Sequence, residues 1–193
     1  EPPRYFIVNT PRGAPCAVKD ERDRPLAADL LPSDVHERLY PAGRLDLDSE
    51  GLVLLTNDGD LMQRATRPGG GVLKIYDVVV GGRPSETDLD ALRSGGELDG
   101  KPLLSCKIEV LERIEVDEVR QPRAAHRGFT LVQVALQQGR KNQIRRMFQG
   151  TRHHVARLLR HSIGSLSLNG LPVGGVREVC GEELRQFKAG LGT

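Results

Sequence analysis

The sequence contains no tryptophan, and only 4% of its 193 residues are aromatic. Proteins that bind long single strands of nucleic acid stack successive bases on aromatic side chains, so this scarcity excludes a wide stacking surface. Cysteine is also rare: Cys16, Cys106 and Cys180 lie far apart and form no CxxC pair. Neither a disulfide framework nor a zinc-binding cysteine cluster is therefore expected, and a reducing, cytoplasmic location is favoured.

Long apolar runs are absent too, and the first residues, EPPRYFIVNTPRG, lack the apolar stretch of a secretory signal. The sequence thus predicts neither a membrane-spanning segment nor a membrane partner. With 38% hydrophobic and 28% charged residues, the chain can bury one ordinary core, or a core divided between two lobes. The net charge is only +2, but arginines cluster in the C-terminal third, and arginine is well suited to phosphate contacts.

Strand-like and helix-like patterns follow one another irregularly along the chain. Apolar or alternating stretches predict strands at 5–8, 52–56, 72–80, 107–114 and 129–137, and a further strand pair around the turn Asn169–Gly170. Spacing and capping residues predict helices at 26–31, 61–65 (after Asp58), 85–93 (with Ser85 as cap), 140–149 and 182–187. Residues 115–128 are polar and are expected to form a surface loop. The pattern indicates an α+β fold.

The most informative segment is GRLDLDSEGLVLLTNDGD, residues 43–60. The apolar strand 52–55 follows Asp46 closely and places this carboxylate at the edge of a rigid core element, near the cation Arg44. Such a carboxylate is a candidate catalytic group. It can equally be a structural residue, because aspartate at a strand entry commonly binds nearby backbone amides. The residues alone leave these two interpretations open.

A third interpretation of the same segment is a calcium loop. Asp46, Asp48 and Glu50 occupy alternate positions, as in the first half of an EF-hand loop. The twelfth position is Asn57, however, which cannot supply the bidentate carboxylate that the ion requires. The apolar residues 52–55 also look like core residues, so this interpretation is the weakest of the three.

A second candidate segment is GRKNQIRRM, residues 139–147. Helical spacing turns its apolar residues inward and spreads its four cations over the other faces, which is usual for a solvated basic helix. Polar residues lie among these cations, and the free amides of a helix start favour phosphate, so binding to an RNA backbone is the competing hypothesis. The residues concerned are Arg140, Lys141, Asn142, Gln143, Arg145 and Arg146.

Other features carry less information when taken alone. Tyr76 lies within a β-branched strand, where most tyrosines are packing residues. The histidines show no metal-ligand spacing. The sequence also has no Walker loop, no dinucleotide fingerprint and no GxSxG elbow.

In combination, these segments resemble the RsuA/RluB/RluE/RluF family of RNA pseudouridine synthases. The resemblance covers most of the chain from about Leu26 to Glu178. It is carried by the segments YPAGRLDLDSEGLVLLTNDGDL, KIYDVVV, QGRKNQIRRMF and LLRHSIGSLSLNGLPVGGVRE.

The resemblance implies the pseudouridine synthase fold, a mixed and largely antiparallel sheet with flanking helices and a central cleft. One catalytic domain is expected over residues 1–193, with lobes of approximately 1–68 (with parts of the C-terminal region) and 69–193. No accessory RNA-binding domain is expected, as in the compact, RluE-like members of the family. A monomer is expected as well.

The resemblance also implies roles for individual residues. Asp46 matches the catalytic aspartate, Tyr76 the tyrosine that stacks on the target uracil and acts as a base, and Arg145 the cation that pairs with the aspartate. Arg44 matches the arginine that fills the gap left by a flipped-out nucleotide. Substrate contacts are further expected from Leu45, Arg140, Lys141, Asn142, Gln143 and Arg146.

The implied activity is isomerisation of a specific uridine to pseudouridine in RNA, with ribosomal RNA, and its large subunit, favoured. Uridine detaches at N1 and rejoins through carbon 5, so no redox step, cofactor or metal is required. Asp46 either attacks the anomeric carbon or removes the 2′ proton. Thr10 and Val176 replace a lysine and a tryptophan that are frequent in the family. The alternative is therefore a catalytically silent RNA-binding or ribosome-assembly module on the same fold.

Overall fold

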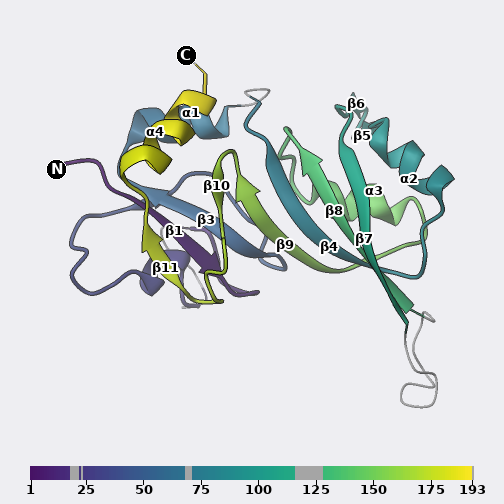
Figure 1. Ribbon diagram of the computed structural model, residues 1–193, viewed down its shortest axis with the longest axis horizontal. Helices are drawn as coiled ribbons and strands as arrows, with labels where there is room; N and C mark the ends of the chain where they lie inside the picture. The colour runs from purple at the N-terminus through teal and green to yellow at the C-terminus, as the bar shows by residue number, and fades with distance from the viewer. Residues whose placement is uncertain (18–21, 23, 68–70, 116–127, 193) are drawn as a thin grey trace. The chain divides into compact units, whose positions relative to one another are not determined.

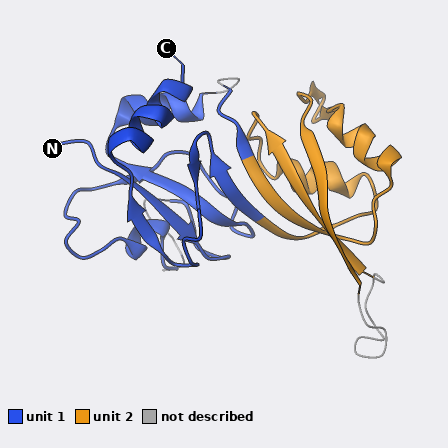
Figure 2. Cartoon of the chain, viewed as in Figure 1, with its two compact units in different colours: residues 1–74, 159–193 blue, residues 75–158 orange. Residues whose placement is uncertain are grey.

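A computed structural model of the chain describes residues 1–17, 22, 24–67, 71–115 and 128–192. The chain divides into two compact units, which Figure 2 colours separately. Unit 1 comprises Glu1–Lys74 and Leu159–Thr193, and unit 2 comprises Ile75–Leu158. The division falls within two strands, β4 (Lys74–Gly81) and β9 (Val155–Ile163). The lobes expected from the sequence, approximately 1–68 with parts of the C-terminal region and 69–193, stay a prediction.

Strand β3 (Glu50–Thr56) is the central strand of unit 1. It pairs antiparallel with β1 (Tyr5–Thr10) and with the short β2 (Tyr40–Pro41), and it pairs parallel with β9. The other edge of β1 pairs with β11 (Val176–Glu178), and β10 (Leu166–Ser167) pairs with β9 (Figure 1). All of β1, and all of β3 after Glu50, is buried. The unbroken apolar run in β3 is typical of a strand that is covered on both faces.

Two helices, α1 (Gly59–Thr66) and α4 (Gly181–Gly190), lie side by side in unit 1 (Figure 1). Asp58 caps α1 as predicted, since its carboxylate accepts hydrogen bonds from the Leu61 amide at 2.9 Å and from the Tyr5 hydroxyl at 2.6 Å. Lys188 of α4 donates to the Tyr5 hydroxyl at 2.7 Å and to Asp58 at 3.3 Å. This network ties both helices to β1, above a core that includes Ile7, Leu52, Leu54, Leu166 and Phe187.

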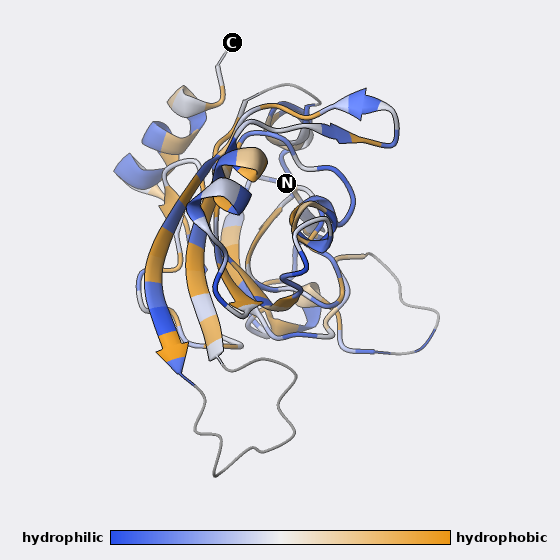
Figure 3. Cartoon of the chain, turned by 90° about the vertical axis from the view of Figure 1, so that its right-hand side faces the viewer, coloured by the Kyte–Doolittle hydropathy of each residue, from blue (hydrophilic) through white to orange (hydrophobic). Residues whose placement is uncertain are grey.

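Unit 2 is built on β4, β8 (Gly128–Leu136) and β7 (Lys107–Glu115), in that order. Strands β7 and β8 are antiparallel, with a bulge between Val110 and Glu112. Buried and half-buried residues alternate along β8, and Figure 3 shows bands of hydrophobic and hydrophilic residues along the strands. The unit also contains the small hairpin β5 (Glu97–Leu98) and β6 (Lys101–Pro102), and the helices α2 (Glu86–Arg93) and α3 (Gln143–Gln149).

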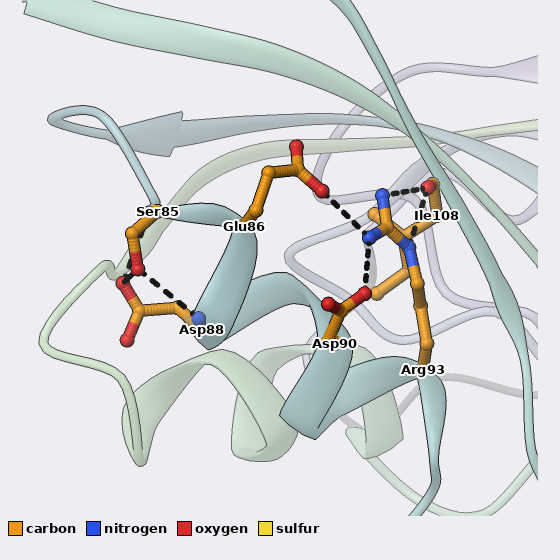
Figure 4. A network of polar contacts seen from close by, with 6 residues as sticks. All are labelled: Ser85, Glu86, Asp88, Asp90, Arg93 and Ile108. Atoms are coloured by element: carbon orange, nitrogen blue, oxygen red, sulfur yellow. Dashed lines mark hydrogen bonds and ion pairs between the residues drawn. The ribbon is translucent and has the colours of Figure 1, made fainter.

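Helix α2 begins with the cap that the sequence predicted (Figure 4). The Ser85 hydroxyl accepts from the Asp88 amide at 3.1 Å, and Asp88 accepts from the Ser85 amide at 3.0 Å. At the other end, Arg93 donates to the carbonyl of Ile108 in β7 at 2.7 and 3.0 Å and pairs with Glu86 and Asp90. The capping box fixes where α2 starts, and Arg93 fixes it against the sheet.

Two helical predictions need correction. Residues 26–31 form only the short 3-10 helix η1 (Ala27–Leu30), whose bonds join residues three apart, such as Leu31 to Ala28 at 3.2 Å. Leu26 and Leu31 both have an extended backbone, and Leu31 precedes Pro32, a position that disfavours the α conformation, so only one short turn remains between them. Helix α3 begins at Gln143 instead of residue 140, because Asn142 has a left-handed backbone with φ of 52°.

The predicted hairpin around Asn169–Gly170 is also wrong. These residues do form a turn, closed by a 2.8 Å bond from the Leu171 amide to the Leu168 carbonyl. The strand before the turn, β10, pairs with β9, whereas the strand after it, β11, pairs with β1. Strand β9 itself and the β5–β6 hairpin were not predicted. The expected loop at 115–128 falls at 116–127 outside the described residues.

The mixed, largely antiparallel sheet, in which β3 and β9 pair parallel, and its helices give the α+β class that the sequence predicted. Within the described residues, no helix combines the length and the apolar character that a membrane crossing requires.

Candidate active site

The Asp46 turn, defined as residues 42–49, connects β2 to β3 in unit 1. The Ala42 amide binds the Leu54 carbonyl at 2.7 Å, and the Ser49 amide binds the Asp46 carbonyl at 2.8 Å, so both ends of the turn are fixed. Leu45 is 8% exposed and anchors the turn in the core. Asp46 is half-buried beside it, and Arg44 is exposed. The Asp46 carboxylate is therefore carried by a turn whose backbone is fixed at both ends.

A second segment, residues 13–16, lies against the Asp46 turn. The Gly13 amide donates to the Leu47 carbonyl at 2.8 Å. Burial raises the pKa of the Cys16 thiol, while a hydrogen bond from the Leu45 backbone and the charge of Arg160 lower it and the charge of Asp46 raises it. The backbone of Leu45 in the turn is thus a hydrogen-bond partner of Cys16, a connection that the residue pattern alone does not indicate.

Arg160 of β9 supports the Asp46 turn from within unit 1. Its side chain is buried, with 3% of the residue exposed. It donates from Nε to the Leu52 carbonyl at 2.8 Å and from Nη1 to the Arg44 carbonyl at 3.2 Å. Buried and more exposed residues alternate along the middle of β9, and Leu158, Arg160 and Ser162 are at the buried positions. A charged residue at a buried position is unusual, and this pattern is the signal in the sequence.

The calcium-loop interpretation is contradicted by the fold. Residues 50–56 form strand β3 and are engaged in the ladder with β1, so they cannot fold around an ion. Asp48 is exposed and pairs with Arg12 at 3.7 Å, which agrees with a role in the turn. In the part of the chain that the structure describes, no cluster of three or more histidine, cysteine, aspartate or glutamate side chains could hold a metal ion.

Tyr76 lies on β4 in unit 2 and is 8% exposed. It shares a strand face with Val78 and Val80, which are fully buried, while Asp77 on the opposite face accepts a hydrogen bond from Gln133 at 3.2 Å. The tyrosine ring is thus buried on the same strand face as these core residues. Two residues earlier, Lys74 belongs to unit 1, where burial, and then the charge of Arg160, lower its pKa.

Arg145 projects from α3 in unit 2. The helix buries Ile144, Met147 and Phe148, as the helical spacing predicted. Arg145 is half-buried and donates from Nη1 to the carbonyl of Val155 at 3.3 Å, where β9 begins. This contact fixes the position of the side chain relative to β9. Its role as the partner of Asp46 stays a prediction.

Two of the cations expected to bind RNA contact the β5–β6 hairpin. Arg140 donates to the carbonyls of Leu98, Lys101 and Pro102 at 3.2, 3.2 and 3.0 Å. Arg146 donates to both carboxylate oxygens of Asp99, at 2.5 and 2.8 Å, and this bonding lowers the pKa of Asp99. The two arginines thus hold the tip of the hairpin against the segment that leads into α3.

The remaining residues of this segment differ in exposure. Lys141 is exposed and Asn142 is half-buried. Gln143 is 5% exposed, and its side-chain oxygen accepts a hydrogen bond from the Arg140 amide at 3.1 Å. Of this group, Lys141 is the residue with the most open access to a phosphate.

The predicted site residues are therefore divided between the two units. Arg44, Leu45 and Asp46 lie in unit 1, where the structure brings them together with Cys16 and Arg160. Unit 2 contains Tyr76, Arg145 and the rest of the 140–146 segment. The sequence did not indicate Arg160 or Cys16 as members of the site.

Comparison with known proteins agrees with the motifs. The family described as "RNA pseudouridylate synthase" matches residues 4–150. The ribosomal large subunit pseudouridine synthase B of Bacillus subtilis (strain 168) is 33% identical over 98% of this chain and 73% of its own length. The ribosomal small subunit pseudouridine synthase A of Escherichia coli (strain K12) is 33% identical over 94% of this chain and 73% of its own length.

A solved structure, titled "Crystal structure of pseudouridylate synthase", is similar in fold as well. It superposes with a TM-score of 0.80 at 29% identity, covering 97% of this chain and 74% of that one. Motifs, fold and relatives agree: the chain belongs to the RNA pseudouridylate synthase family and is an isomerase that acts on RNA.

Proposed function

We propose that this enzyme converts a uridine of ribosomal RNA, with the large subunit favoured, into pseudouridine, and that Asp46 is its catalytic residue. The observation that carries the proposal is the Asp46 turn, which holds a half-buried carboxylate on a backbone fixed at both ends. A catalytic group must be held within a fraction of an ångström of its productive position, and a backbone that is fixed at both ends supports this role for Asp46. The names of the two relatives support ribosomal RNA as the substrate.

The reaction is an isomerisation and needs no other reactant. The bond between N1 of uracil and the anomeric carbon C1′ breaks, the base rotates, and C1′ forms a new bond to C5. The proton on C5 is then lost, and N1 gains one, so atoms and electrons balance. Asp46 starts the sequence in one of two ways: as a nucleophile at C1′, whose bond to C1′ breaks when C5 attacks, or as a base that removes the 2′ proton and later returns it to C2′.

The target nucleotide must leave the RNA stack before it can react. Base flipping costs a few kcal/mol, and contacts that are made only with the flipped state offset this cost. Arg44, which is exposed on the Asp46 turn, fills the space that the nucleotide vacates. Tyr76 stacks on the detached uracil and accepts the C5 proton, and Arg145 aligns the Asp46 carboxylate.

Phosphate contacts supply the rest of the binding energy. Lys141 is exposed and reaches the RNA backbone directly. Arg140 and Arg146 act through the β5–β6 hairpin that they hold, and contribute positive charge to the same region. Binding to RNA is therefore expected to weaken as salt concentration rises, since each neutralised phosphate releases counterions.

Pseudouridine mapping of ribosomal RNA tests this proposal and identifies the target. RNA from both ribosomal subunits is compared between cells that contain the gene, cells that lack it, and cells in which it is restored. We expect a site in large-subunit RNA that disappears with the gene and returns on restoration. Loss of a small-subunit site would overturn the choice of subunit. Unchanged maps in both subunits would overturn ribosomal RNA as the substrate.

The silent RNA-binding module makes a different prediction. It binds RNA in a salt-dependent manner but converts no uridine in any RNA. The purified protein, incubated with an unmodified large-subunit ribosomal RNA transcript, distinguishes the two: appearance of pseudouridine excludes the silent module.

A further inference from the structure

We propose that Arg160 is a positioning residue that holds the Asp46 turn in its productive conformation. The inference rests on the proposed catalytic role of Asp46. Arg160 donates to the carbonyl of Arg44, two residues before Asp46, and to the carbonyl of Leu52, in the strand after it. One planar guanidinium thus connects the entrance of the turn to the strand that leaves it.

Burial separates Arg160 from any direct contact with substrate. Only 3% of the residue is exposed, and in the described part of the chain its Nη2 has no hydrogen-bond partner. A buried cation is costly unless a structural gain compensates for it. The gain here is the fixed distance between two backbone carbonyls on either side of Asp46.

The contact between β3 and β9 brings the guanidinium to this position. Gly51 and Arg160 are partners in the parallel pairing of these strands. A Cβ atom at Gly51 would lie 2.4 Å from the Arg160 carbonyl oxygen and 2.8 Å from its amide nitrogen, so only glycine permits this approach. Gly51 is itself in the left-handed region, with φ of 108°. Glycine at position 51 therefore allows the backbone of Arg160 to lie close to β3, beside the turn.

Electrostatic effects agree with this placement. The charges of Asp46 and Arg160 act in opposite directions on the pKa of Cys16, and the charge of Arg160 also lowers the pKa of Lys74. Arg160 therefore supplies positive charge to the same small region of unit 1 that contains Asp46. This charge and the two carbonyl contacts come from the same side chain.

Arg160→Lys tests the geometric part of the inference. Lysine retains the positive charge, but a single ammonium group cannot reproduce the planar fork that reaches both carbonyls. We expect kcat for pseudouridine formation to fall about 100-fold, the order of effect that a displacement of about 1 Å has on a catalytic group. The dissociation constant for a large-subunit ribosomal RNA transcript should stay unchanged, because the side chain is buried.

Arg64→Lys is the matched control. Arg64, also in unit 1, donates to two backbone carbonyls, those of Lys188 and Gly192, and has a buried nitrogen, Nε, without a hydrogen-bond partner in the described part of the chain. Arg64→Lys should lower the free energy of unfolding but leave kcat near the wild-type value. Equal kcat values for Arg160→Lys and Arg64→Lys would overturn the inference.

A local measurement separates positioning from a general loss of stability. Hydrogen exchange at the Ser49 and Gly13 amides, which bind carbonyls of the Asp46 turn, should become faster in Arg160→Lys than in Arg64→Lys. Unchanged exchange at both amides would contradict the inference. If Arg160→Lys does not fold, Arg160→Gln, which keeps one amide donor, takes its place in both measurements.

The proposed function and the inference can fail separately. Asp46→Asn is measured alongside, with the same RNA transcript. Activity in Asp46→Asn would overturn the proposed catalytic role of Asp46. An inactive Asp46→Asn together with a fully active Arg160→Lys would leave the catalytic role of Asp46 intact and reject the role of Arg160.

Discussion

Asp46 and Asp48 lie two residues apart in the same turn, but their surroundings differ. Asp46 is half-buried and follows the anchor Leu45, and the carbonyl of Arg44, two residues before it, accepts a hydrogen bond from Arg160. Asp48 is exposed, with 71% of its side chain accessible, and pairs loosely with Arg12 at 3.7 Å. An exposed pair of this kind contributes little to stability. The difference in surroundings is the physical basis for assigning the chemistry to Asp46.

At Tyr76, the ring and the hydroxyl are expected to have separate functions. Tyr76→Phe keeps a flat ring for stacking but removes the oxygen that we propose as the acceptor of the C5 proton. Loss of a general base typically slows a reaction by about 100-fold to 10,000-fold, so we expect a fall in this range for tritium release from C5-labelled uridine in RNA.

Binding provides the control for this variant. The RNA dissociation constant of Tyr76→Phe should equal that of the wild type, whereas Tyr76→Leu should weaken engagement of the flipped base as well. Full activity of Tyr76→Phe would reject the base role and leave only stacking.

At the residue scale, sequence alone could propose Asp46 but could not separate it from a structural aspartate. The resemblance to the family favours the catalytic interpretation, because its motifs match Asp46, Tyr76 and Arg145 together, and the role of Asp46 stays a prediction. Arg160 could not be proposed, since its function depends on the carbonyls that β9 brings it near, and strand β9 was not predicted. The inward position of Arg160 becomes informative only once β9 is known to be a strand.

At the scale of elements, the β3–β9 pairing depends on Gly51. Gly51→Ala would force a Cβ to within 2.4 Å of the Arg160 carbonyl, at a φ of 108° that other residues rarely adopt. We expect a loss of about 2 kcal/mol or more in the free energy of unfolding, measured by urea denaturation.

Gly59→Ala is the matched control for this prediction. Gly59 is the first residue of α1, and an added Cβ there meets nothing within 4 Å. Alanine favours helix over glycine, so this variant should be neutral or more stable by up to about 1 kcal/mol. Equal stability of the two variants would contradict this prediction and show that β3 and β9 accommodate a Cβ atom at position 51.

Elements whose signals are local were predicted well. Asp58 and Ser85 cap their helices because a cap needs only the amides of the next turn. Strand pairing was harder: Asn169–Gly170 has the residue types of a hairpin turn, but its flanking strands pair with β9 and β1 instead of each other. Which strands become partners depends on residues far apart in sequence, and turn residues do not encode it.

At the scale of the whole molecule, stability should depend on pH through Asp58. Burial acts to raise the pKa of Asp58, but hydrogen bonds from Tyr5, the Leu61 amide and Lys188 together hold it below its ordinary value. Because the folded pKa is the lower one, this stabilisation is complete above the unfolded pKa of about 3.9 and is lost as pH falls through the folded pKa.

Urea denaturation from about pH 7 to about pH 2 should therefore show a fall in the free energy of unfolding that begins near pH 4. Glu183, whose pKa is lowered by its hydrogen bonds with Arg177, adds to the same acid loss. Asp58→Asn should give a flatter profile than the wild type. A profile as steep as that of the wild type would show that the Asp58 network contributes nothing to acid sensitivity.

The central claim is that a single carboxylate, Asp46, performs the chemistry of this enzyme. Tritium release from C5-labelled uridine in a large-subunit ribosomal RNA transcript tests it most directly, with purified wild type, Asp46→Asn and Asp48→Asn. We predict release by the wild type and by Asp48→Asn, and none by Asp46→Asn, which still binds the RNA. Release by Asp46→Asn at the wild-type rate would contradict the claim.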